Sequence, residues 1–425
     1  MTVDKVFCNI PWTEVHINAD GTYHTCGAQP NPQRMPINQL LNNKYNVHSM
    51  TIPEWINSQY QQQVRLDKLN GVYEPRCSMC YAEEEAGSSS KRVKENLKSK
   101  ISNINFIDSY NSSPDKQYFD YSKNNNGLTN ILKPESYHIS LGNECNYACK
   151  MCGPWASSKL AVEGLQNGTY FGPAKQNWTE DLTAWNHVTD YICSTDNLKF
   201  VHLIGGEPLL NPRFENLIDK LLAAGKTNIY LGFTTNGSIV DAALIEKLNA
   251  FRHVDIGISI ECAGLLNDYI RKGTRTQEVL NNIDVYLKYR KEAHVYVTIR
   301  PVPSALSVHT LDELYRWCIN RRVDVMTNIL VRPEHLQIKH LPQEIKNKLL
   351  AKYYQWEYSE PLPGTSDPRD PNRFKEHIDS EVRAVINLLK QENNVDQTKK
   401  LYDTITQWGW FNNAGISKYF EAADW

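Results

Sequence analysis

The sequence lacks several features that would place it among membrane-bound or secreted proteins. Residues Met1 to Trp12 contain neither the basic segment nor the apolar segment of a signal peptide. No apolar run approaches the roughly 18 residues that a membrane-spanning helix requires. We therefore expect a soluble, cytoplasmic protein without a membrane partner.

The sequence also lacks a block of basic residues. Its formal net charge is −2 at pH 7, and no lysine- or arginine-rich stretch stands out. Strong binding to nucleic acid requires a concentrated positive surface, usually a stripe with interleaved aromatic side chains. Nucleic acid is therefore a disfavoured partner.

The chain is nevertheless long and rich in cysteine. It has 425 residues, 41% of them hydrophobic, and ten cysteines. A chain of this length can bury a sizeable core and hold more than one domain. Without a signal sequence, we interpret the cysteines as metal or redox residues rather than as disulfide partners.

Three cysteines form the tightest motif of the chain. Cys145, Cys149 and Cys152 follow the alternating run Ser136 to Leu141 with C-x3-C-x2-C spacing. Thiolates suit iron–sulfur clusters, and so short a loop lets three sulfurs converge on one cluster, leaving its fourth iron open to a substrate or cofactor. A zinc site is the alternative, although structural zinc usually has four protein ligands.

This motif resembles that of the radical S-adenosylmethionine (SAM) superfamily. The resemblance implies a [4Fe-4S] cluster on the three cysteines, with SAM bound to the open iron and Tyr147 beside its adenine. It also implies that SAM is cleaved to a 5′-deoxyadenosyl radical that abstracts hydrogen from a substrate. An electron donor such as flavodoxin or ferredoxin would reduce the cluster. The protein would then supply position and shielding.

Four more cysteines lie in the N-terminal quarter. Cys8 and Cys26 flank two short predicted strands, Trp12 to Ile17 and Thr22 to Cys26, joined by an Asp-Gly turn that is typical of a β-hairpin. Cys77 and Cys80 form a C-x2-C pair after a helix predicted from Ile52 to Leu69. By spacing alone, four thiolates suit zinc and a [4Fe-4S] cluster equally well.

This N-terminal pattern resembles the twitch domain, a shortened relative of the SPASM domain. The resemblance favours an auxiliary [4Fe-4S] cluster on Cys8, Cys26, Cys77 and Cys80. That family usually places the module after the catalytic barrel, whereas here it precedes the barrel. Its docking onto the barrel is therefore not implied.

From Ser136 onward, predicted strands alternate with amphipathic helices, which indicates parallel βαβ units. The further strands are Phe200 to Leu203, Ile229 to Thr234, Val254 to Ile260, His294 to Ile299 and Val323 to Leu330. About six units are visible, fewer than the eight of a closed barrel. The radical SAM core is similar, being a partial (β/α)6 barrel.

The predicted organisation is therefore α/β with four parts. Residues 1–102 form the twitch-like domain, and residues 103–134, rich in Asn, Ser, Asp and Lys, form a linker. Residues 135–340 form the partial barrel. Residues 341–425 form a helical C-terminal extension.

Polar residues at the predicted strand ends are the candidate cofactor ligands. Gly205, Gly206 and Glu207 lie at one strand end, where glycines permit close approach of a ligand. After the cysteine motif they resemble the G-G-E motif that meets the SAM amino group. Asn236 ends the next strand and is expected to face the barrel mouth.

Four further residues complete the candidate set for SAM or substrate. Ser259 and Glu261 share one face of a strand by period-two alternation, and the family similarly places polar groups there for the SAM carboxylate and ribose. Arg271 resembles the arginine that pairs with the SAM carboxylate. Arg300 is a candidate for SAM or substrate.

Cys262 is the candidate catalytic residue, because a thiol after Glu261 at the mouth could return a hydrogen atom to a substrate radical. The leading hypothesis is a two-electron oxidation of a small molecule such as a sugar or aminocyclitol, with the auxiliary cluster accepting an electron. Epimerisation through Cys262 and modification of a peptide are the alternatives. A non-catalytic scaffold with N-terminal zinc is the alternative outside the enzymes.

Overall fold

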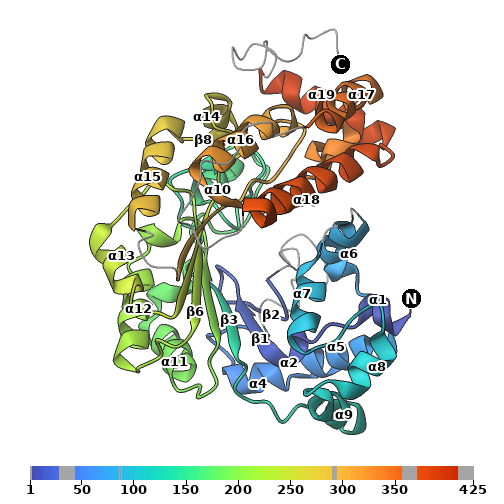
Figure 1. Ribbon diagram of the computed structural model, residues 1–425. Helices are drawn as coiled ribbons and strands as arrows, with labels where there is room; N and C mark the ends of the chain where they lie inside the picture. Colours follow the sequence, from blue (N-terminus) through green and yellow to red (C-terminus); the bar gives the residue numbers. More distant parts are fainter. Residues whose placement is uncertain are drawn as a thin grey trace.

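The computed structural model describes residues 2–27, 44–85, 87, 89–289, 294–356 and 371–409. Figure 1 shows a central sheet with helices on both sides. In these ranges no helix is both long enough and apolar enough to cross a membrane.

The central sheet has eight strands in the order β10-β9-β7-β6-β5-β3-β1-β2. All neighbouring strands are parallel except β1 and β2. From β3 to β10 the strands follow one another in chain order, as right-handed βαβ units require. The strands are β1 (Glu14–Ile17), β2 (Tyr23–His24), β3 (Ser136–Ser140), β5 (Phe200–Ile204), β6 (Tyr230–Thr235), β7 (His253–Ile258), β9 (Val295–Ile299) and β10 (Asp324–Val325).

Six parallel strands confirm the predicted α/β fold with a mostly parallel sheet. The predicted starts of these six strands agree with the structure to within one residue, but two of their ends differ by more. β7 ends at Ile258 rather than at Ile260, and β10 has two residues where the sequence predicted eight. An apolar run marks a strand more reliably than it marks where the pairing stops.

The outer face of the sheet is covered by helices of the barrel units. Val254, Ile256 and Ile258 of β7 are fully buried on this face, whereas the intervening residues point to the opposite, inner face. Figure 1 shows α11, α12, α13 and α15 along the outer side. The helices are α10 (Ser158–Gln166), α11 (Leu182–Cys193), α12 (Arg213–Ala223), α13 (Ala242–Leu248), α14 (Leu266–Ile270), α15 (Thr276–Tyr289) and α16 (Leu311–Arg321).

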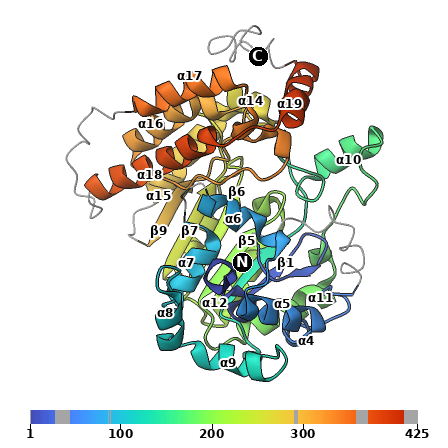
Figure 2. The same ribbon diagram turned by 90° about the vertical axis from the view of Figure 1, so that its right-hand side faces the viewer.

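The N-terminal quarter lies on the other side of the sheet, and Figure 2 shows α6 and α7 in front of the strands. Phe7, Trp12, Ile101 and Phe119 form a separate small core there. The helices are α1 (Val3–Val6), α2 (Ile10–Thr13), α4 (Ile52–Ile56), α5 (Gln59–Asn70), α6 (Ser78–Glu85), α7 (Lys91–Lys98), α8 (Phe106–Ser112) and α9 (Lys116–Asn124).

The predicted N-terminal hairpin forms, but it is shorter than expected. Gly21 adopts φ +82° at the turn, a conformation that favours glycine. Trp12 and Thr13 belong to helix α2 rather than to the first strand. In addition, β1 pairs in parallel with β3. The hairpin thus continues the barrel sheet instead of forming a detached module.

The segment predicted as a linker, residues 103–134, contains the helices α8 and α9. Phe119 of α9 is 1% exposed, and Trp12 donates its indole N–H to Ser122 Oγ at 2.8 Å. Aromatic side chains at helical spacing anchor a segment whose Asn- and Ser-rich composition suggested a linker.

The predicted helix Ile52 to Leu69 is two helices, α4 and α5. Thr51 caps the first, and a capping box with Glu54 is present. Ser58 accepts a hydrogen bond from Gln61 N and starts the second. The cap at Ser58, in the middle of one apolar pattern, divides the predicted helix into two.

The described end of the chain is helical. It contains α17 (Gln343–Tyr354), α18 (Pro371–Lys390) and α19 (Val395–Gln407). Tyr269 beside the barrel mouth donates its hydroxyl to Trp408 O at 2.9 Å, and Lys150 lies over both rings. The end of α19 therefore packs next to the cysteine loop.

Candidate active site

The loop with three cysteines leaves β3 at the carboxyl edge of the sheet. The loop after β5 runs beside it, because Gly206 N donates to Gly142 O and Glu207 N donates to Glu144 O, both at 2.8 Å. Backbone hydrogen bonding between β3 and β5 thus extends into the two loops that follow these strands.

The two glycines of the second loop permit this pairing. A Cβ on Gly206 would lie 2.1 Å from Glu144 O, and one on Gly205, whose φ is +157°, would lie 2.7 Å from Gly142 O. The sequence suggested that these glycines admit a ligand. In the structure they admit the cysteine loop, because any side chain would collide with its backbone.

The three thiols share one buried environment. Burial raises the pKa of Cys145 to about 11 and that of Cys152 to about 12, and it also raises that of Cys149. Arg271 opposes this effect at all three, because it lies opposite Cys149 where β4 (Ala148–Cys149) pairs with β8 (Arg271–Lys272). Three converging sulfurs beside a fixed cation fit an anionic iron–sulfur cluster.

No group of three or more His, Cys, Asp or Glu side chains in the described ranges is arranged to hold a single metal ion. The fit of the cluster therefore depends on the donor set and its surroundings. Those surroundings are the backbone of two joined loops and one arginine.

Arg271 and Glu261 form a buried ion pair next to the thiols. Glu261 is fully buried and accepts hydrogen bonds from Arg271 Nη1 at 2.9 Å and Val302 N at 2.7 Å. Burial opposes the charge of Arg271, but Cys149 and Glu261 together raise its pKa. Its Nε is buried without a hydrogen-bond partner. An unused N–H beside the cluster site fits a carboxylate ligand such as that of SAM.

Glu207 and Asn236 connect β6 to the cysteine loop. The Glu207 carboxylate accepts from Asn236 N at 2.6 Å and from Thr235 Oγ1 at 2.8 Å, while burial raises its pKa. Asn236 Nδ2 donates to Asn146 Oδ1 at 2.7 Å. The structure thus brings both predicted residues to the cysteines, with Glu207 already bound by protein donors.

Tyr147 and Ser259 lie at the same edge. Tyr147 is 4% exposed, its backbone N–H points at Cys145 Sγ at 3.4 Å, and burial raises the pKa of its hydroxyl. Ser259 is half-buried just after β7, and its N–H donates to Thr235 O at 2.9 Å.

Arg300 lies on the inner face of the sheet, apart from the cysteine loop. Its guanidinium crosses Gly257 and contacts Asp255, and Nη1 donates to Thr234 Oγ1 at 3.3 Å. Its Nε is buried without a partner. This position favours a substrate role over contact with the cluster.

Cys262 does not open onto the mouth. It is 2% exposed and belongs to the hydrophobic core, and its Sγ lies 4.0 Å from Gly264 O. Burial raises the pKa of its thiol to about 12. The strand alternation ends at Ile258, so the position after Glu261 could not be assigned to a face from the sequence.

The four N-terminal cysteines come together from three separate segments. Charges on Cys77 and Cys80 act on Cys8, and those on Cys8 and Cys80 act on Cys26. Burial raises the pKa of Cys8 to about 12 and that of Cys80 to about 11. The four predicted thiols thus lie in one region of the N-terminal part, but within the described residues no three of them are arranged to hold a single metal ion.

A row of four histidines on the inner face was missed by the sequence analysis. His24, His16, His138 and His202 lie opposite one another on β2, β1, β3 and β5. Successive ring centroids are 6.0, 6.2 and 5.4 Å apart. Burial lowers the pKa of each, to about 3 for His16, so burial disfavours the charged form at every position of the row. Alternation within each strand was the only available signal, and it becomes informative only after the register is known.

A buried ion pair joins this row to the N-terminal helices. Lys91 of α7 contacts Glu14 of β1 at 2.7 Å and His138 at 3.2 Å, and His138 Nε2 lies 3.1 Å from Glu14. Burial opposes ionisation of Glu14, but His138 and Lys91 hold its pKa well below its usual range. Lys91 also acts on Cys26. The contact therefore links the four-cysteine group with the inner face.

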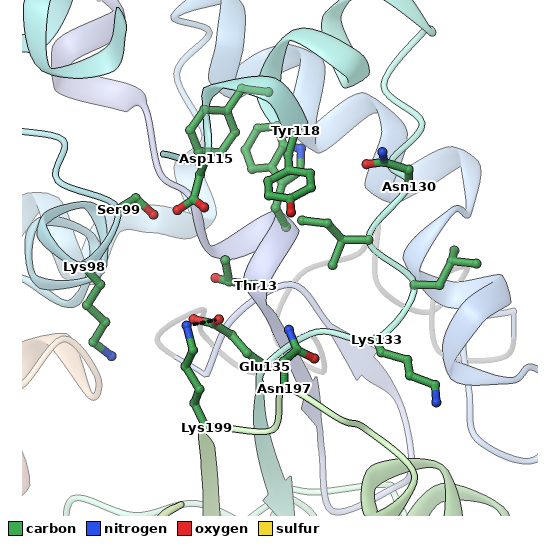
Figure 3. A pocket seen from close by; sticks show the side chains of 14 residues that line it. Thr13, Lys98, Ser99, Asp115, Tyr118, Asn130, Lys133, Glu135, Asn197 and Lys199 are labelled. Carbon is green, nitrogen blue, oxygen red and sulfur yellow. Dashed lines mark ion pairs between the residues drawn. The ribbon is translucent and has the colours of Figure 1, made fainter. Parts of the chain in front are cut away.

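Two pockets lie elsewhere. One encloses about 650 Å³ and is lined by residues that include Lys98, Asp115 and Lys133. Figure 3 shows that Glu135 and Lys199, whose side chains are 2.5 Å apart, border it at the starts of β3 and β5. The other, about 590 Å³, adjoins α8. Neither is lined by any predicted site residue, and the first lies at the edge of the sheet opposite the cysteine loop.

Comparisons with known proteins agree with this architecture. Residues 139–318 match the family model of the Radical SAM superfamily. An uncharacterized protein of Methanocaldococcus jannaschii is 25% identical over 227 residues, which cover 50% of this chain and 69% of that protein.

Two solved structures are similar at lower identity. Native anSMEcpe with bound AdoMet is 19% identical with a TM-score of 0.40, covering 52% of this chain and 60% of that one. Streptococcus suis SuiB bound to S-adenosylmethionine is 17% identical with a TM-score of 0.39, covering 69% and 61%. The chain thus spans about three fifths of each, and we draw no conclusion from these two similarities.

The cysteine loop, its partner loop and the six parallel strands all lie within or beside the matched residues. The matched region implies SAM and one [4Fe-4S] cluster as cofactors. The match to the Radical SAM superfamily is thus confined to residues 139–318 and coincides with the cysteine loop, its partner loop and most of the parallel sheet.

Proposed function

We propose that this protein is a radical SAM enzyme that carries out a two-electron oxidation of a small, hydroxyl-bearing molecule such as a sugar or aminocyclitol. The observation that carries the proposal is the placement of two cysteine groups around one polar inner face. The three-cysteine loop lies at the carboxyl edge of β3, and Lys91 connects the four-cysteine group to His138 on the same strand.

The residues of the chain divide the task between the two groups. Cys145, Cys149 and Cys152 would hold the [4Fe-4S] cluster, and Arg271 would offer its unused Nε to the SAM carboxylate. When bound, the cluster and SAM supply the radical that removes a hydrogen atom. The inner face, with Arg300 and Asp255, would orient the substrate and exclude water.

The four N-terminal cysteines would hold the electron acceptor. Oxidation of a hydroxyl-bearing carbon removes one hydrogen atom, one proton and one electron, so a second redox centre is needed for the last electron. Four thiols with nearby buried cations suit an anionic iron–sulfur centre. Zinc would suit the same ligands but accept no electron.

The alternatives receive less support from the geometry. Epimerisation through Cys262 would require a radical to reach a thiol that is 2% exposed within the apolar core. A peptide substrate fits the resemblance to SPASM proteins, and a peptide that stimulates SAM cleavage would replace the small-molecule proposal. A scaffold would bind zinc without visible colour and leave SAM intact.

The test is anaerobic reconstitution of the native chain and of a Cys145/Cys149/Cys152→Ala variant, followed by assays of iron, sulfide, zinc and 5′-deoxyadenosine. The proposal expects about eight irons in the native chain and about four in the variant, with 5′-deoxyadenosine formed only by the native chain. About four irons plus zinc, with the iron lost in the variant, would contradict the two-cluster oxidation.

A further inference from the structure

Lys68 of α5 occupies an unusual place among the charged residues. It is 3% exposed, and its Nζ donates a hydrogen bond to Cys77 Sγ at 3.2 Å. Its ammonium group is thus held against a sulfur of the four-cysteine group. A buried ammonium costs several kcal/mol unless a negative charge lies beside it.

No carboxylate within the described residues forms an ion pair with Lys68. Glu74 is near enough to be affected by its charge, but Arg76 binds both oxygens of that carboxylate, at 2.8 and 2.6 Å. The negative charge that Lys68 requires must therefore come mainly from the sulfurs. Neutral thiols would not provide it, whereas thiolates bound to a metal would.

Two other cations near these cysteines differ from Lys68. Lys91, beside Cys26, is paired with Glu14 at 2.7 Å. Arg92, beside Cys8 and Cys80, is paired with Glu84 and also donates to Phe7 O at 2.9 Å. Both charges are already balanced by an acid of the chain, and only the charge of Lys68 depends on the cysteines.

We propose that Lys68 is a positioning residue of the N-terminal four-cysteine centre, which balances the charge of the metal-bound thiolates and holds Cys77 in place. The inference rests on the proposed metal centre but not on its identity, since four thiolates around zinc or around a [4Fe-4S] cluster both leave an anionic group. In an iron–sulfur centre, the ammonium also favours the reduced, more negative state.

The experiment uses the full chain with Cys145, Cys149 and Cys152 replaced by alanine, so that only the N-terminal centre contributes. Lys68→Met removes the charge and keeps the length of the side chain, whereas Lys68→Arg keeps the charge. Lys98→Met is the matched control, because Lys98 is 60% exposed on the neighbouring helix α7. Circular dichroism checks that each variant folds.

Two quantities are measured after reconstitution with iron and sulfide. The first is the rate of metal loss to an excess of chelator, which we expect to rise about 10- to 100-fold in Lys68→Met, the usual effect of removing an outer partner of a metal ligand. The second is the midpoint potential of the centre, which we expect to become more negative. Lys98→Met should leave both unchanged, and Lys68→Arg should retain most of the metal.

The inference is overturned if Lys68→Met retains its metal like Lys98→Met, or if Lys68→Arg loses it as fast as Lys68→Met, since shape rather than charge would then matter. If the centre contains zinc, the proposed oxidation fails, but the rate of zinc loss from the same variants still decides the role of Lys68. If the four cysteines bind no metal, both proposals fail.

Discussion

The two cysteine groups are built in opposite ways. Cys145, Cys149 and Cys152 lie within eight residues of one loop, and backbone hydrogen bonds to Gly206 and Glu207 fix that loop. The four N-terminal cysteines come from three segments, and buried cations surround them. A local site can be held by backbone alone, whereas a dispersed site depends on the side chains and helices that bring its parts together.

Mutations should affect the two cysteine groups differently. Damage to the loop should remain confined to one site, because its ligands and its support are contiguous. Damage to the dispersed group should spread into the packing of α5, α6 and α7. The following changes test this difference, from the largest expected effect to the smallest.

Replacement of one ligand in each group should separate the two sites most clearly. We expect Cys149→Ala to abolish formation of 5′-deoxyadenosine and to lower the iron content by about four atoms per chain. We expect Cys80→Ala to prevent metal binding at the proposed N-terminal centre but to leave cleavage of SAM in the absence of substrate largely intact. Equal loss of cleavage in both variants would contradict the division of roles.

Glu14→Gln should destabilise the dispersed side strongly. The change leaves Lys91, whose side chain is 23% exposed, without its acid, at a cost toward the lower end of the about 3–5 kcal/mol of a buried pair, measured as the difference in free energy of unfolding in urea at pH 7. Because the folded pKa of Glu14 is depressed, its contribution is present above the ordinary glutamate pKa of about 4.3. It is lost as the pH falls below that value, so the gap between variant and native chain should narrow in acid. If the difference in free energy of unfolding between the variant and the native chain stayed constant down to pH 3, the lost ion pair could not be the cause of that difference.

Gly206→Ala should affect the loop alone. Its Cβ would lie 2.1 Å from a backbone oxygen, so the two loops must separate, at a cost of about 1–3 kcal/mol. Gly264→Ala is the control, because a Cβ there meets nothing within 4 Å. Both variants also carry Cys80→Ala, so that only iron on the cysteine loop contributes to the visible spectrum. We expect this absorbance to decrease in Gly206→Ala and to stay unchanged in Gly264→Ala. Normal iron in both variants would show that the close approach is not needed.

His202→Ala should have the smallest effect on stability, about 1 kcal/mol, since it removes one hydrogen bond to Thr234 and the ring contacts with His138 and Phe200. It does not contact the cysteine loop in the structure, so SAM cleavage without substrate should persist. Coupled oxidation of a substrate should decrease. His187→Ala is the control, because His187 is exposed, and it should change neither SAM cleavage nor substrate oxidation. If substrate oxidation decreased equally in His187→Ala, the inner face would not be supported as the substrate site.

The sequence predicted those features that are local. The strand pattern and the C-x3-C-x2-C loop were visible because each is set by neighbours in the chain. Glu207 and Asn236 could be placed near the cysteines because strand ends of a parallel sheet share one edge. The hydrogen bond between Asn236 N and the Glu207 carboxylate could not be predicted, since it depends on how β5 and β6 align.

The features that the sequence did not predict depend on register and distant packing. The histidine row requires β1 to pair with β3, a contact between residues far apart in the chain. The buried place of Cys262 depends on where β7 ends. Lys68 appears in the sequence as one helical lysine among others, and only its burial beside Cys77 distinguishes it.

The pairing of β1 with β3 also decides what happens at the border of the sheet. With the hairpin present, both sides of β3 are occupied, by β1 and by β5. Removal of the first 27 residues would leave a row of unpaired backbone donors and acceptors along β3, a surface that readily recruits strands from other molecules. The N-terminal segment therefore covers the edge of β3, and we expect a chain that begins after it to aggregate even where its own core is intact.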